Sequence, residues 1–224
     1  MYAIITGSSS GLGLEIIEFL LDQDYVVFAG SRSEPDLKHE NLFYIPLDVR
    51  SEDSVIQFYA AVAQETDEIH LLVNNAGVCE MSSLDETTTE SVLNQFETNA
   101  LGPFLMLKHL DELVVEGETH IVNILSAAAK YAYPNVSAYV ASKHALRGLL
   151  ETARKEWSER GVRFSNLYPG AINTPLWDKL EAKFSREKML TIDEFMHVFE
   201  MVVLSPPMLQ FSDITFLHKD GYID

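Results

Sequence analysis

Short apolar, β-rich runs alternate with amphipathic helical patterns along the chain, and this alternation limits the folds open to it. The expected strands cover residues 2–6, 25–30, 42–45, 69–74, 120–125, 162–168 and 214–217. The expected helices cover residues 11–22, 52–65, 88–115, 136–160 and 191–204, with a short one near 175–185. Continuous apolar runs such as Leu71-Leu72-Val73 are typical of parallel strands covered on both faces. The pattern predicts the α/β class: a doubly wound parallel sheet of about seven strands flanked by helices, in a single domain over residues 1–224.

Composition and charge exclude several classes of protein. The net charge of −18 disfavours nucleic acid and anionic membrane as partners, because both attract basic surfaces. The longest apolar runs fall short of the roughly 20 residues of a membrane helix. Met1 leads directly into a strand-like run, so we expect no signal peptide. Cys79 is the sole cysteine, so we expect neither a disulfide nor a cysteine-based metal site, and a cytoplasmic location is the simplest expectation.

A glycine-rich turn follows the first expected strand and leads at once into a helix. Its sequence is Thr6-Gly7-Ser8-Ser9-Ser10-Gly11-Leu12-Gly13. Glycine permits a tight turn and a close approach of the backbone to a ligand. The amides and the positive dipole end of the helix then favour a pyrophosphate. A serine-rich turn that merely caps the helix is the alternative, but the strand–turn–helix context favours phosphate binding.

Further motifs follow in a fixed order along the chain. They are Leu47-Asp48-Val49, Asn74-Asn75-Ala76-Gly77, Asn99, Ser126, Tyr139-x-x-x-Lys143, and Pro169-Gly170 followed by Thr174. Together with the TGxxxGxG turn they resemble the short-chain dehydrogenase/reductase family. The resemblance implies a Rossmann fold and an enzyme that moves hydride between a nicotinamide cofactor and a small, apolar carbonyl or alcohol substrate.

Tyr139 and Lys143 lie on the inward stripe of the helix expected at 136–160. The stripe continues through Leu146, Leu150, Ala153 and Trp157 at spacings of three and four residues. An ammonium one turn from a phenol is expected to favour its ionised form and so to lower its pKa. The resemblance assigns Tyr139 as the acid/base, Lys143 as its electrostatic partner and ribose ligand, and Ser126 as hydrogen-bond donor to the reacting oxygen. Alternatively, Lys143 extends outward into solvent.

Asn99 lies four residues before Pro103 in the helix expected at 88–115. Proline has no amide hydrogen, so the Asn99 carbonyl loses its helical donor and we expect a kink. The family resemblance implies that this asparagine binds a water in a proton relay that reaches the lysine. A kink closed by a structural water, with no part in turnover, is the alternative.

The end of the second strand bears on the choice of nicotinamide cofactor. Ser31 stands where relatives that prefer NAD carry aspartate, and Arg32 offers a guanidinium that matches a 2′-phosphate. We therefore predict NADP (NADPH), against the alternative that Arg32 pairs with Glu34 or Asp36 at the surface. The expected cofactor contacts are Gly7, Ser9, Ser10, Gly11, Leu12, Gly13, Arg32, Asp48, Val49, Asn75, Ala76, Gly77, Tyr139, Lys143, Pro169, Gly170, Ile172 and Thr174.

The expected substrate walls and partners follow from the same resemblance. Residues 127–136, with Tyr131 and Tyr133, form one wall. A second segment with Leu176, Trp177, Leu180 and Phe184 forms either a lid or a helix packed on the core. In the family the helices corresponding to 88–115 and 136–160 are the usual dimer surfaces, so the resemblance implies a homodimer or homotetramer. A non-catalytic NADP-binding redox sensor and a sugar-nucleotide epimerase are the rival functions; the retained Ser126, Tyr139 and Lys143 disfavour the first, and the short chain disfavours the second.

Overall fold

A computed structural model describes residues 1–179 and 185–220 of the chain. One seven-stranded sheet runs through these residues in the order β3-β2-β1-β4-β5-β6-β7, and every neighbouring pair is parallel. The strands are β1 (Tyr2–Thr6), β2 (Val26–Ser31), β3 (Leu42–Pro46), β4 (Leu71–Asn74), β5 (His120–Ile124), β6 (Arg163–Pro169) and β7 (Asp213–Phe216). The predicted α/β class with a doubly wound, all-parallel sheet is confirmed.

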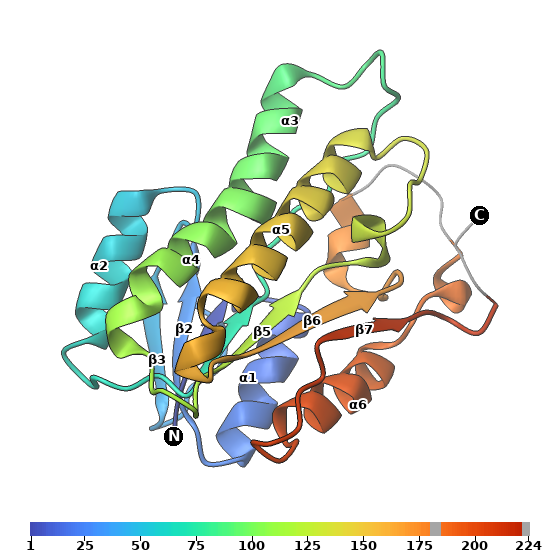
Figure 1. The fold of residues 1–224 in the computed structure, drawn as a ribbon. Helices are drawn as coiled ribbons and strands as arrows, with labels where there is room; N and C mark the ends of the chain where they lie inside the picture. Colours follow the sequence, from blue (N-terminus) through green and yellow to red (C-terminus); the bar gives the residue numbers. More distant parts are fainter. Residues whose placement is uncertain (180–184, 221–224) are drawn as a thin grey trace.

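Helices cover both faces of this sheet (Figure 1). They are α1 (Leu12–Asp22), α2 (Glu52–Val62), α3 (Thr89–Phe96), α4 (Gly102–Leu110), α5 (Ser137–Glu156) and α6 (Ile192–Val203). Side chains alternate along each buried strand, so β4 sends Leu72 into the core under α2, α4 and α5. Its neighbours Leu71 and Val73 enter the opposite core, against α1 and α6. This two-sided burial explains why the strands read as continuous apolar runs.

Local sequence signals account for where the helices begin. Thr191 caps α6 with a capping box, in which its hydroxyl accepts a hydrogen bond from the Glu194 amide and the Glu194 carboxylate accepts one from the Thr191 amide. The buried face of α6 carries Phe195 and Phe199, four residues apart. Ser51 caps α2 in the same general way. The hydrophobic period and the cap together fix the starts of α2 and α6.

The strand order places a topological switch between β1 and β4. The chain builds β1, β2 and β3 outward in one direction, then crosses back and builds β4 to β7 on the other side of β1. Connections from the carboxyl ends of β1 and β4 therefore diverge and leave a crevice in which such sheets bind ligands. Thr6 and Asn74 end these two strands.

The helix expected at 88–115 is broken, and the break differs from a simple proline kink. A π-helical turn (Glu97–Leu101) separates α3 from α4, and a short 3-10 turn (Asp111–Leu113) follows. The Gly102 amide donates to the carbonyl of Glu97, five residues earlier. Because Pro103 has no amide hydrogen, the regular pattern cannot continue through it, and the wider turn absorbs the mismatch. The expectation of a kink is corrected to a π turn that contains Asn99.

Other boundaries differ slightly from expectation. Helix α5 stops at Glu156 and a 3-10 turn (Ser158–Arg160) follows. The segment near 175–185 contains the 3-10 turn Pro175–Lys179, and a second 3-10 turn (Arg186–Lys188) follows the segment. The expected lid residues Leu180 and Phe184 lie outside the described residues. The connection between β2 and β3 has no helix. Across the described residues, none of the helices combines the length and apolarity needed to cross a membrane.

Candidate active site

The glycine-rich turn forms the tight link between β1 and α1. Gly11 precedes α1 with φ of 58°, a conformation that favours glycine. A Cβ on Gly13 would lie 2.2 Å from the Gly7 carbonyl oxygen, so the helix packs directly on the turn. Within the described residues, no side chain caps the start of α1. The first amides of this helix are therefore suited to a phosphate.

Other predicted cofactor residues surround this turn. Ser9 is half-buried and Ser10 exposed in the turn itself, and Leu12 is the first residue of α1. The segment after β6 returns to the same place: a Cβ on Gly11 would lie 3.8 Å from Thr174 Cβ and 3.6 Å from Pro175 Cδ. Segments more than 160 residues apart in the chain thus lie side by side at this edge of the sheet.

The loop after β4 braces the glycine-rich turn from the other side. The Asn75 amide group donates to the carbonyls of Thr6 and Gly7 at 2.9 and 3.0 Å. The backbone amides of Asn75 and Ala76 both donate to Thr6 Oγ1 at 3.1 Å. These contacts tie the end of β4 to the end of β1. They also place Ala76 and Gly77 beside the crevice.

Ser126, Tyr139 and Lys143 converge at the carboxyl ends of β4 and β5. Lys143 is 4% exposed, so it is buried and does not extend into solvent. Its Nζ donates to the Ile124 carbonyl at 3.2 Å and lies 5.8 Å from the centroid of the Tyr139 ring. Ser126 hydrogen-bonds the Tyr139 side chain. The predicted trio therefore forms one cluster at the carboxyl edge of the sheet.

Burial dominates the electrostatics of this cluster. It raises the pKa of Tyr139 well above its ordinary value of 10.0, and the nearby Cys79 adds to the rise, while the hydrogen bond from Ser126 opposes it. Burial likewise lowers the pKa of Lys143 from 10.5 to about 8. We expected the ammonium to lower the pKa of the phenol; the direction is the reverse, because partial burial of the phenol and full burial of the ammonium disfavour both charges.

Asn99 connects the π turn to the active-site loop. Its Oδ1 accepts a hydrogen bond from the Val78 amide, and its Nδ2 donates to the Val78 carbonyl, both at 2.9 Å. The same Nδ2 donates to Ser142 Oγ at 3.0 Å. A Cβ on Gly77 would lie 3.4 Å from Asn99 Oδ1 and 3.6 Å from Lys143 Nζ. Asn99 is therefore beside the cluster, with its side chain holding the loop in place; its part in a proton relay stays a prediction.

The adenosine end of the expected cofactor site lies at the ends of β2 and β3. Ser31 is 5% exposed; its hydroxyl accepts from Ser8 at 2.9 Å and donates to the Ser33 carbonyl at 2.6 Å. Arg32 is exposed beside it. The pKa of Asp48 is lowered, chiefly by hydrogen bonds from Arg50 and in smaller part by the charge of Arg32. Arg32 thus follows the end of β2, and Ser31 before it carries no carboxylate.

Some of the remaining predicted cofactor residues lie at strand ends, and others are buried in the core. Val49 is buried, and a Cβ on Gly102 at the start of α4 would lie 2.8 Å from it. Pro169 ends β6, and the Gly170 amide donates to the carbonyl of Phe216. Ile172 is buried and forms a β-bridge with Leu190. Val49 and Ile172 therefore serve the packing of the site at least as much as any ligand contact.

Three residues near the site were missed by the sequence analysis. Cys79 is close enough to Tyr139 and Lys143 to influence the pKa of both. Ser142 accepts from Asn99 and donates to the Tyr139 carbonyl at 2.8 Å. Arg50 makes charged hydrogen bonds to Asp48, the shortest at 2.7 Å. The position of Ser142 inside the Tyr-x-x-x-Lys motif was a usable signal, whereas nothing in the sequence places Cys79 or Arg50 in this way.

Comparisons with known proteins agree with this geometry. The family model for short chain dehydrogenases matches residues 1–184. An uncharacterized oxidoreductase of Bacillus subtilis, YusZ, is 32% identical over 194 residues, which cover 81% of this chain and 69% of that protein. Sepiapterin reductase of Chlorobaculum tepidum is 30% identical and covers 85% of each chain.

A solved structure supports the same assignment. An alcohol dehydrogenase from the archaeon Thermococcus sibiricus, complexed with 5-hydroxy-NADP, matches with a TM-score of 0.86 at 28% identity, over 97% of this chain and 96% of that chain. The glycine-rich turn at the topological switch, and the cluster of half-buried Ser126 and Tyr139 with buried Lys143, suit a nicotinamide cofactor. The chain is an oxidoreductase that belongs to the short-chain dehydrogenase/reductase family.

Proposed function

We propose that this enzyme transfers hydride between NADP and a small, apolar carbonyl or alcohol substrate, with Tyr139 as the acid/base. The observation that carries the proposal is the convergence of half-buried Ser126 and Tyr139 with buried Lys143 at the carboxyl edge of the sheet. A hydroxyl and a phenol that hydrogen-bond one another offer two donors to a single substrate oxygen. Bound nicotinamide would supply hydride to the carbonyl carbon or accept it from the alcohol carbon.

Each residue of the cluster has a distinct part in this proposal. Tyr139 donates its phenolic proton to the substrate oxygen during reduction and recovers it during oxidation. Ser126 hydrogen-bonds that oxygen and orients it. Lys143 holds the ribose of the nicotinamide end and, while protonated, stabilises negative charge on the phenol. The buried Ile124 carbonyl fixes the Lys143 side chain for both tasks.

Four features support the choice of NADP over NAD. Ser31 offers no carboxylate to repel a 2′-phosphate or to bind the ribose hydroxyls in its place. Exposed Arg32 follows it and supplies a planar guanidinium that matches phosphate. The Thermococcus sibiricus relative is complexed with an NADP derivative. The turn residues Ser9 and Ser10 add hydroxyl donors near the same point.

We propose assembly and location by the same reasoning. Leu93, Leu101 and Phe104 expose apolar surface along α3, the π turn and α4, which supports burial against a second copy in a homodimer or homotetramer. A cytoplasmic location accords with the single cysteine.

The decisive experiment is a screen of small aldehydes, ketones and alcohols that follows NADPH absorbance, with NADH in parallel. On the best substrate, Tyr139→Phe is expected to lower turnover by roughly 100-fold or more, because the ring remains and the transferable proton is lost. NADPH affinity of the variant should stay unchanged. Near-normal turnover by the variant would show that Tyr139 is not the proton donor.

A further inference from the structure

The segment between Ser126 and the expected substrate wall is a single helical turn. Ser126 ends the run that begins in β5, and its hydroxyl caps a 3-10 turn (Ala127–Ala129) by accepting from the Ala128 amide. The alanines of this turn are buried. The next residue, Lys130, closes the turn by donating its amide to the Ala127 carbonyl. Whatever holds Lys130 therefore fixes the turn at the end opposite Ser126.

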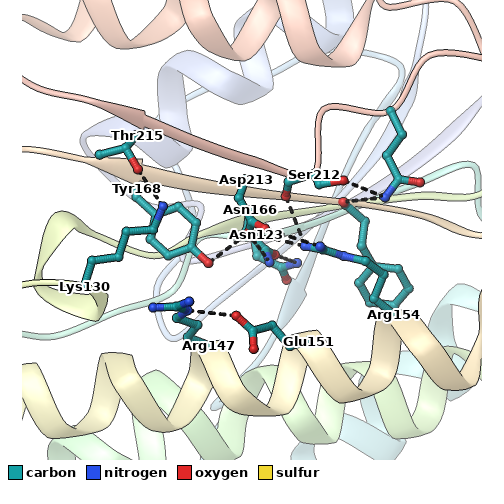
Figure 2. Close-up of polar contacts among 12 residues, drawn as sticks. Asn123, Lys130, Arg147, Glu151, Arg154, Asn166, Tyr168, Ser212, Asp213 and Thr215 are labelled. Atoms are coloured by element: carbon teal, nitrogen blue, oxygen red, sulfur yellow. Dashed lines mark hydrogen bonds and ion pairs between the residues drawn. The ribbon is translucent and has the colours of Figure 1, made fainter.

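The Lys130 ammonium binds across two strands at once (Figure 2). It donates to Thr215 Oγ1 at 2.7 Å and lies 3.9 Å from the centroid of the Tyr168 ring. Tyr168 on β6 and Thr215 on β7 are register partners in the parallel pair. One cation thus links a loop at residue 130 to a strand 85 residues further along the chain.

The hydrogen bond that the Tyr168 hydroxyl donates strengthens the contact of its ring with Lys130. Tyr168 is fully buried, and its hydroxyl donates to Asp213 Oδ1 at 2.9 Å (Figure 2). Burial would raise the pKa of Asp213, but hydrogen bonds from Arg154, Asn166 and Tyr168 together hold it below its ordinary value. Asp213 is therefore ionised at neutral pH. A phenol that donates to a carboxylate has a more electron-rich ring, which attracts an ammonium over its face more strongly.

The Asp213 carboxylate is held by a row of asparagine side chains that crosses the sheet. Asn74, Asn123, Asn166 and Asp213 are consecutive register partners on β4 to β7. Each asparagine donates its side-chain amide to the next residue of the row, at 2.8, 3.0 and 3.1 Å. Asp213 cannot move without breaking this row. The anchor for Lys130 is accordingly built into the sheet.

We propose that Lys130 is a positioning residue for catalysis: its contact with Tyr168 and Thr215 holds the 127–129 turn, and with it Ser126 and the wall formed by residues 131–136. The catalytic part of this inference rests on the proposed function, in which Ser126 orients the reacting oxygen. The anchoring part depends on the protein alone. The C-terminal strand β7 thereby becomes part of the active-site scaffold, although it lies two strands from β5.

Hydrogen–deuterium exchange of the full chain tests the anchor without any substrate. Lys130→Met removes the charge and keeps an apolar stem, and Lys130→Arg keeps a cation over the ring. Lys155→Met, at an exposed position on α5, is the matched control for loss of one positive charge. Amides of residues 126–136 are expected to exchange about tenfold faster in Lys130→Met, and near the wild-type rate in Lys130→Arg and in the control. Wild-type exchange in Lys130→Met would overturn the anchor.

Steady-state kinetics then test the catalytic part. In Lys130→Met we expect kcat/KM to fall about tenfold through a lower kcat as well as a higher KM, with NADPH affinity unchanged and recovery in Lys130→Arg. Equal kcat/KM in wild type and Lys130→Met would overturn the positioning role. If the wild-type protein binds no nicotinamide cofactor, the proposed function fails, and the exchange experiment still decides whether Lys130 anchors the loop.

Discussion

Replacement of Lys143 by methionine should stabilise the protein while it removes activity. Methionine keeps the length and the apolar stem of lysine but carries no charge. The pKa of Lys143 falls from 10.5 to about 8 because the ammonium is buried. That difference corresponds to about 3 kcal/mol of unfavourable free energy whenever the buried group is charged. Loss of the hydrogen bond to the Ile124 carbonyl offsets about 1 kcal/mol of the gain.

The pH dependence of this effect follows from proton binding. Below pH 8, lysine is charged in both the folded and the unfolded chain, so the wild-type protein bears the full cost of burial. Between pH 8 and 10.5, the unfolded chain keeps the proton that the folded protein has lost, so wild-type stability rises with pH. The advantage of Lys143→Met is therefore about 2 kcal/mol near neutral pH and disappears toward pH 10.5.

Urea denaturation, followed by tryptophan fluorescence at about pH 7 and about pH 9.5, measures this difference. For a chain of this size, 2 kcal/mol corresponds to an increase in Tm of roughly 4–8 °C. Lys155→Met on the exposed side of the same helix should show a small effect without this pH trend. A Lys143→Met protein that is less stable than wild type near pH 7, or an advantage equal at both pH values, would refute the reasoning.

Four further predictions concern the turn, helix α5, the cofactor and the pH profile. Gly13→Ala should abolish cofactor binding and destabilise the fold, because its Cβ would lie 2.2 Å from a backbone oxygen of the turn. By contrast, Gly148→Ala meets no atom within 4 Å and should raise the unfolding free energy by about 0.5–1 kcal/mol in denaturant titrations. Arg32→Ser should weaken NADPH binding by about tenfold or more in calorimetry and leave NADH binding unchanged. Carbonyl reduction, measured as initial rate, should hold up to about pH 8 and decline above it as Lys143 loses its proton.

Most of the fold was predictable because it depends on periodicity that a single sequence carries. Continuous apolar strands and amphipathic helices gave the parallel sheet and its seven strands. The position of the break in the helix expected at 88–115 was predicted correctly, but its geometry was not. Pro103 signals a missing donor, whereas the choice of a π turn over a kink depends on how α3 and α4 pack, which no local pattern specifies.

The sequence predicted which residues form the candidate site better than it predicted their pKa values. Motif spacing brought Tyr139 and Lys143 together correctly, because one helical turn separates them. The predicted direction of the Tyr139 pKa shift was wrong. Burial depends on the folded protein, and it outweighs the charge near the ring. Contacts across the sheet, such as that of Lys130 with Tyr168 and Thr215, join residues whose neighbourhood depends on the strand order.

The direction of these pKa values bears on the direction of the reaction. Reduction of a carbonyl needs a phenol that still holds its proton, whereas oxidation of an alcohol needs the phenolate. Burial raises the pKa of Tyr139 well above neutral, so the protonated form dominates at physiological pH. Lys143, whose pKa is about 8, is mostly protonated at neutral pH and stabilises the phenolate that proton donation leaves behind. The protein's own residues therefore favour donation of a proton to a carbonyl oxygen, which agrees with the proposed use of NADPH as the reductant.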